Sequence, residues 1–178
     1  MTEIEEAKQE LIEKIKRKVI ETGGCPLSGF VMIDTPNGYK TAYCPASGQN
    51  TAKDKYVFVE SLKALLYHLK DTEDRKPVCL IVAAEAYMTT ATTLEEAEKA
   101  RPSTDPNRKE VIVLDIQEEE NTKTLCFEII RTGSTERSKI KEIKLIEEID
   151  EHYLNPKGKS MFANIFMRKA FSNKIDDI

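Results

Sequence analysis

An unbroken apolar run, Val78 to Ala84 (VCLIVAA), constrains the fold more than any other feature of this chain. The run follows Pro77, and its length suits a strand. A strand with one solvent-facing side alternates apolar and polar residues, whereas a run without polar interruption is typical of a buried strand. The sequence therefore predicts a central strand that is covered on both faces.

Three segments have the three- and four-residue apolar spacing of amphipathic helices. The first, residues 2–22, begins with Thr2 and Glu5 in the arrangement of a capping box and ends before Gly23, which favours a left-handed stop. The second covers residues 57–69, and we expect it to pack on the sheet. The third covers residues 159–171 and is apolar on more than one side. That pattern indicates either burial against the sheet or the interface of a homodimer.

The remaining apolar segments have strand length. Two of them flank Asn37-Gly38, a strong signal for a β-hairpin, here spanning residues 29–44. Three more follow in close succession at residues 110–116, 123–131 and 139–146, with short polar connections that suit an antiparallel meander. We therefore predict a single α+β domain over residues 1–178, with its core at 57–147. It contains a mainly antiparallel sheet of five to six strands with helices on one face.

Composition narrows the function classes. A formal charge of −4, with both signs interspersed, gives no basic footprint for nucleic acid, so a nucleic-acid partner is unsupported. No run approaches the ~18 apolar residues of a membrane span, and the acidic start does not resemble a signal peptide. The four cysteines are too few for a disulfide scaffold. We expect a cytoplasmic protein with reduced thiols, no cofactor and no membrane partner.

A five-residue pattern, C-P-x-S-G, occurs twice, starting at Cys25 and at Cys44 on either side of the hairpin. Residues 25–48 resemble the paired C-P-x-C-G knuckles of zinc ribbons. Ser28 and Ser47 stand where a zinc ribbon has its second thiolates, and a hydroxyl is a poor zinc ligand. We favour metal-free turns or buried thiols. The alternative is a metal or redox site in which Cys25 and Cys44 take further ligands from elsewhere.

A second pattern runs from the sequence Glu85-Ala86-Tyr87-Met88 through Arg-Pro-Ser at 101–103 to Arg108 and Glu110. With the preceding helix and strand, residues 62–131 resemble a family of small uncharacterised bacterial and phage proteins with the pattern E-A-[WY]-M, R-P-S, P-x-R-x-E. The resemblance implies a shared fold core and no particular activity.

Four residues of this pattern form the candidate ligand site: Glu85, Tyr87, Arg108 and Glu110. They meet at one edge of the sheet if the strand that ends near Glu85 pairs with the strand that starts near Glu110. The alternative is a structural ion pair between Glu85 and Arg108 that fixes the connection between the strands. That connection, residues 89–108, is rich in threonine and has the features of a recognition loop.

Catalytic patterns are sparse. The two histidines, His68 and His152, lie in no metal-ligand spacing, and no glycine-rich phosphate loop is present in the sequence. The best enzymatic alternative is a nuclease-like Mg²⁺ site built on Asp115 and Glu128, with Lys144 after Glu142 stabilising phosphate charge. We therefore expect a non-enzymatic binding or interaction protein of phage or mobile-element origin. Its partner is a macromolecule or a small molecule, and the metal-dependent nuclease is the alternative.

Overall fold

The fold is described from a computed structural model. It covers residues 2–48, 51–70, 72, 74–89, 93–99, 101, 104–119, 121–135 and 138–150. The elements follow in the order α1 (Glu3–Thr22), β1 (Ser28–Thr35), β2 (Gly38–Pro45), α2 (Ala52–Lys70), β3 (Lys76–Met88), α3 (Leu94–Lys99), β4 (Lys109–Gln117), β5 (Thr122–Arg131) and β6 (Ile140–Asp150). The helix predicted at residues 159–171 lies outside the described residues.

The six strands form one sheet in the order β2-β1-β3-β4-β5-β6, and every neighbouring pair is antiparallel. The predicted α+β class and the antiparallel sheet are confirmed. β3 is longer than its apolar run and continues to Met88, so Glu85 and Tyr87 lie within the strand. The β1–β2 hairpin turns at Gly38, whose φ of 91° favours glycine.

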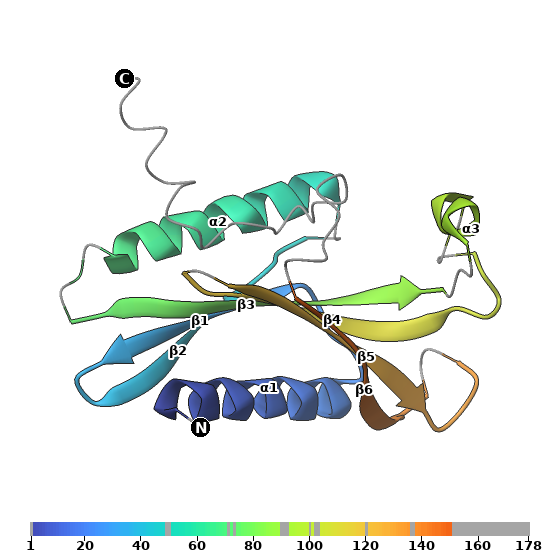
Figure 1. Cartoon of the computed structure of the whole chain (residues 1–178), viewed down its shortest axis with the longest axis horizontal. Coiled ribbons are helices and arrows are strands. Elements are labelled where there is room, and N and C mark those ends of the chain that lie inside the picture. Colours follow the sequence, from blue (N-terminus) through green and yellow to red (C-terminus); the bar gives the residue numbers. More distant parts are fainter. Residues whose placement is uncertain are drawn as a thin grey trace.

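The two long helices lie on opposite faces of the sheet, with α2 above it and α1 below it in Figure 1. Alternate residues of β1 and β3 supply two cores. One core contains Met32 and Ile81 with α1, and the other contains Val31 and Leu80 with α2. The prediction that the helices share one face is wrong. The physical reason is that β1 and β3 are apolar on both sides, so each side needs a cover.

The ends of α1 follow from local chemistry. The Thr2 side chain accepts a hydrogen bond from the backbone N–H of Glu5 at 3.4 Å, as the capping pattern predicts. Gly23 has a φ of 81° and donates its N–H to the Val19 carbonyl at 2.8 Å, which stops the helix.

No helix in the described part of the chain combines the length and the apolar character needed to cross a bilayer.

Contact between α2 and β1 depends on a glycine. Leu62 of α2 is fully buried, and a Cβ atom built on Gly29 of β1 would lie 2.6 Å from the Leu62 Cδ2 atom. The helix therefore approaches the strand where the strand has no side chain. Leu62 fills the space above Gly29 and belongs to the core between α2 and the sheet.

Candidate functional site

Three charged side chains from neighbouring strands meet at one end of the sheet. Glu85 of β3 faces Ile112 of β4, and Ile112 faces Phe127 of β5. Side chains two residues apart on a strand point to the same side, so Glu110 and Arg131 share this side with Glu85. It is the side that α1 covers. We call Glu85, Glu110 and Arg131 the carboxylate–arginine cluster.

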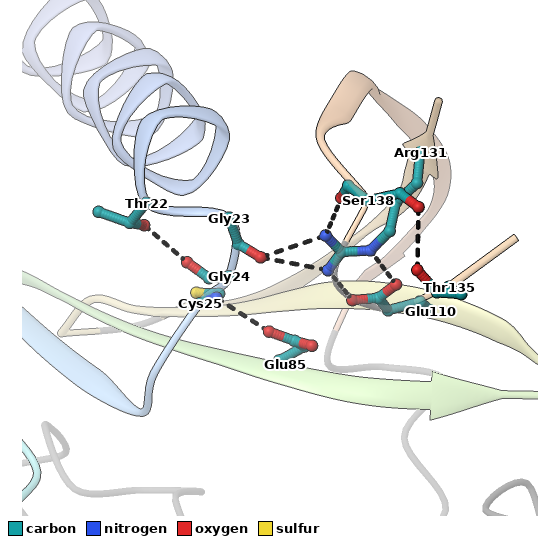
Figure 2. Close-up of polar contacts among 9 residues, drawn as sticks. All are labelled: Thr22, Gly23, Gly24, Cys25, Glu85, Glu110, Arg131, Thr135 and Ser138. Carbon is teal, nitrogen blue, oxygen red and sulfur yellow. Dashed lines mark hydrogen bonds and ion pairs between the residues drawn. The ribbon is translucent and has the colours of Figure 1, made fainter. Parts of the chain in front are cut away.

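Arg131 ties four segments of the chain together, as Figure 2 shows. Its guanidinium binds the Glu110 carboxylate through two nitrogens, with Nε donating to Oε2 at 2.7 Å. It also donates to the carbonyl of Gly23 at 3.2 Å and to that of Ser138 at 2.9 Å. The side chains of Arg131 and Glu110 are only 7% and 12% exposed. The pair is therefore an almost buried, bidentate ion pair that holds the end of α1 against the sheet.

Glu85 has a different environment from Glu110. Its Oε2 atom accepts a hydrogen bond from the backbone N–H of Cys25 at 2.9 Å. Partial burial raises the pKa of Glu85, and the neighbouring Glu110 carboxylate raises it further, against the opposing effects of the Cys25 N–H and Arg131. The hydrogen bonds from Arg131 instead lower the pKa of Glu110. Glu85 is thus the carboxyl of the two that more readily holds a proton.

Tyr87 and Arg108 form a stacked pair. The guanidinium carbon of Arg108 lies 4.3 Å from the centre of the Tyr87 ring, a cation–π contact. The alternative to a ligand site, from the sequence, was a structural ion pair between Glu85 and Arg108. In the structure the cation that acts on Glu85 is Arg131, while Arg108 covers Tyr87.

Two cavities open at this end of the molecule, and Tyr87 lines both. The first, of about 680 Å³, is lined by both C-P-x-S-G turns, the start of α2 and the end of β3, including Glu85. We call it the turn cavity. The second, of about 490 Å³, is lined by Arg108, Glu110 and Arg131 together with residues 133–135. The structure thus gathers the other three predicted ligand-site residues, Glu85, Arg108 and Glu110, around Tyr87.

The two C-P-x-S-G segments have different structural roles. The Ser28 hydroxyl donates to the Pro26 carbonyl at 2.9 Å, and Gly29 gives room to α2. Gly48 instead has a φ of 102°, and a Cβ atom there would lie 2.4 Å from the Asp54 carboxyl. The repeat therefore describes two turns that the fold requires for separate reasons.

The two cysteines of the predicted metal site are not brought together. Cys25 belongs to the core on the α1 side of the sheet, whereas Cys44 packs against the core on the α2 side. Burial raises the pKa of the Cys25 thiol to about 12, and Glu85 adds to the effect. Because metals bind the thiolate, this environment disfavours a zinc ligand. Within the described ranges, no three His, Cys, Asp or Glu side chains form a group that would hold a metal ion.

The nuclease-like set is also dispersed. Asp115 faces Thr124 across β4 and β5, and Glu128 faces Val111, so the two carboxylates lie four residues apart along the strands. At about 3.3 Å per residue this places them roughly 13 Å apart, too far for one Mg²⁺ ion. Glu128 faces Lys144 and pairs with Lys109 at 3.1 Å, while Asp115 accepts a hydrogen bond from the Gln117 side chain at 2.9 Å.

Sequence reasoning missed Arg131 and the Gly23 carbonyl. Arg131 ends an apolar strand, where a charged residue is ordinarily solvated, so its type alone gave no signal. The signal that could have revealed Arg131 was the side of β5 on which it lies. Leu125, Phe127 and Ile129 alternate toward the α1 side, and continuing this alternation places Arg131 on the same side as Glu110.

Comparison with known protein families, curated proteins and solved structures finds no match to this chain. The resemblances noted for residues 25–48 and 62–131 remain predictions. We therefore infer the function from the geometry of the site.

The raised pKa of Glu85 predicts a pH-dependent effect of Glu85→Gln. The folded protein binds this proton more tightly than the unfolded chain. The resulting stabilisation is fully present below the unfolded pKa of about 4.3 and is lost as the pH rises through the folded pKa. Glutamine keeps an oxygen for the Cys25 N–H and does not ionise. The melting temperature of Glu85→Gln should therefore exceed that of the wild type near neutral pH, and the difference should shrink toward zero at about pH 4.

Calorimetric melting temperatures measured across this pH range test the prediction. Glu21→Gln, at an exposed position of α1, is the matched control and should change the melting temperature only slightly. A destabilising effect of Glu85→Gln at neutral pH, or a difference that stays constant with pH, would contradict the assignment of the proton to Glu85.

Proposed function

We propose that this protein is a binding protein whose ligand site is the turn cavity. One observation carries the proposal. Cys25, Ser47 and Tyr87, which are widely separated in the sequence, line one cavity of about 680 Å³. That volume lies in the range of small-molecule sites, which span about 300–1,000 Å³. Such a cavity also accepts a single side chain of a protein partner.

The lining favours a ligand with a cationic group and an apolar body. Two carboxylates line the cavity, Asp54 and Glu85. Asp54 accepts hydrogen bonds from the backbone N–H of Thr51 at 3.0 Å and from its hydroxyl at 2.7 Å, as the start of α2 requires. Glu85 has a raised pKa beside Glu110, so a bound cation would relieve the repulsion between the two carboxyls. Tyr87 supplies an aromatic surface next to Glu85.

No nucleophile-and-base arrangement supports catalysis within the described part of the chain. His68 lies exposed on α2, the Cys25 thiol has a pKa of about 12, and Asp115 is separated from Glu128. A binding role needs none of these groups. It requires a shaped, polar and aromatic surface on a rigid support, and β3 with the two turns supplies that support.

Titration of ¹⁵N-labelled protein with aryl and alkyl amines, and with the alcohols of the same shape, tests the proposal. Benzylamine and benzyl alcohol form one such pair. We expect the amines to shift the backbone resonances of Gly24, Gly48, Glu85 and Tyr87, and the alcohols to bind more weakly. Tyr87→Ala should weaken amine binding by roughly tenfold, because it removes the aromatic surface against which the apolar body of the ligand packs.

Tyr67→Ala is the matched control, since Tyr67 is an exposed tyrosine of α2 at 52% exposure. It should leave the titration unchanged. Shifts confined to other parts of the molecule, or equal weakening in both tyrosine variants, would show that the turn cavity is not the site.

A further inference from the structure

The outer edge of β2 plays no part in the proposed function. β2 is the first strand in the sheet order and, among the described residues, has a strand neighbour only on the β1 side. Tyr43 is 56% exposed and Thr41 is exposed, although both lie in the middle of an eight-residue strand. Long strand edges with exposed aromatic residues tend to pair with another chain.

The register shows which backbone groups point outward. The Ala46 N–H donates to the Leu27 carbonyl at 3.0 Å, and this pair continues the β1–β2 register. Bonded and non-bonded pairs alternate in an antiparallel ladder, so the even-numbered residues of β2 bond to β1. The N–H and C=O groups of Tyr39, Thr41 and Tyr43 therefore point away from β1. Pro45, which has no N–H, also falls on the outer side, where proline is tolerated.

The two edges of the sheet differ in charge. β6, at the opposite edge, carries exposed Lys141, Glu142, Lys144, Glu147 and Glu148. Dense edge charge is a common protection against pairing between chains. β2 carries a single charged residue, Lys40. The side chains of Tyr39, Thr41 and Tyr43 point to the α1 side, where the Tyr43 ring lies 5.2 Å from that of Phe30.

We propose that β2 pairs with β2 of a second copy of this chain, antiparallel and with the two-fold axis at Thr41. In this register Thr41 faces its own symmetry mate, and Tyr39 faces Tyr43 of the second copy. Every outward N–H of one strand then meets an outward C=O of the other. The cross-strand pairs are two Tyr–Tyr pairs and one Thr–Thr pair, which are among the favourable pairs in sheets.

Other registers also place the outward N–H and C=O groups of the two β2 strands opposite each other, but these registers are less favourable. Moving the axis to Lys40 places two lysines directly opposite and is disfavoured by charge. Moving it to Ala42 places Tyr39 opposite Pro45, which has no N–H to donate to the Tyr39 carbonyl. The axis at Thr41 places Lys40 opposite Ala42, so no like charges meet. The assembly is a continuous two-fold sheet, which a self-complementary edge permits.

Sedimentation analysis of the full chain with Thr41→Lys tests the proposal. The wild type should be a dimer, and Thr41→Lys should raise its dissociation constant by about tenfold or more, because two lysines then face each other across the axis. Thr41→Val should keep the dimer, since β-branched residues pair well in strands. Thr132→Lys, which adds the same charge at an exposed site on the loop after β5, should also keep it.

Cysteine cross-linking fixes the register. The Cα atoms of a hydrogen-bonded pair lie about 5.5 Å apart, within reach of a disulfide. In a Cys44→Ser background, Thr41→Cys should form a disulfide-linked dimer under mild oxidation, and Lys40→Cys should form none. A monomeric wild type, a dimer unaffected by Thr41→Lys in a folded variant, or equal cross-linking at both positions would each overturn the proposal.

Discussion

Replacing Arg131 with methionine should lower the free energy of unfolding by about 3–5 kcal/mol. The substitution leaves the Glu110 carboxylate, only 12% exposed, without its bidentate partner. It also removes the hydrogen bonds that Arg131 donates to the carbonyls of Gly23 and Ser138. An almost buried charge that loses its partner keeps its desolvation cost, so the loss exceeds that of an exposed ion pair.

Urea denaturation of four proteins measures this effect: the wild type, Arg131→Met, Glu110→Gln and the double variant. We expect the double variant to be more stable than Arg131→Met alone, because position 110 then carries no almost buried charge that lacks its partner. Lys99→Met is the control, since Lys99 forms an ion pair at 74% exposure and should contribute at most about 0.5 kcal/mol. A loss below about 1 kcal/mol for Arg131→Met would show that the cluster does not hold α1 to the sheet.

Leu62→Ala should cost about 2–5 kcal/mol of unfolding free energy. Leu62 is fully buried and fills the space that Gly29 leaves between α2 and β1. Truncation creates a cavity that β1 has no side chain to fill. The same measurement on Leu145→Ala is the control. Leu145 is 46% exposed, so that truncation should cost about 1 kcal/mol or less. Similar losses at the two positions would contradict the packing of α2 against β1.

The elements themselves were largely predictable, because their signals are local. The Thr2 cap and Gly23 determine the ends of α1, and the Asn37-Gly38 pair marks the hairpin. The face of each helix was not predictable in the same way. A helix with one apolar side, such as the one predicted at residues 57–69, can cover either face of the sheet. The spacing of its apolar residues therefore does not show which face it covers. The unbroken apolar run of β3 carried that information, since it requires cover on both sides.

The candidate site was predictable in part. Glu85, Tyr87, Arg108 and Glu110 lie close in the fold because β3 and β4 pair, which the strand order already favoured. The turn cavity was not predictable, because it also needs the C-P-x-S-G turns, and the contact of Cys25 with Glu85 spans 60 residues. Such a contact depends on the β1–β3 register, which no local pattern determines.

Whether the turn cavity binds cationic ligands is best tested by a crystal structure of the full chain soaked with the amine that most shifts the Tyr87 resonance. We expect electron density for the amine in the turn cavity, with its nitrogen at the Glu85 carboxyl and its apolar body against the Tyr87 ring. Density for the amine at another site, with only water between Glu85 and the C-P-x-S-G turns, would contradict it.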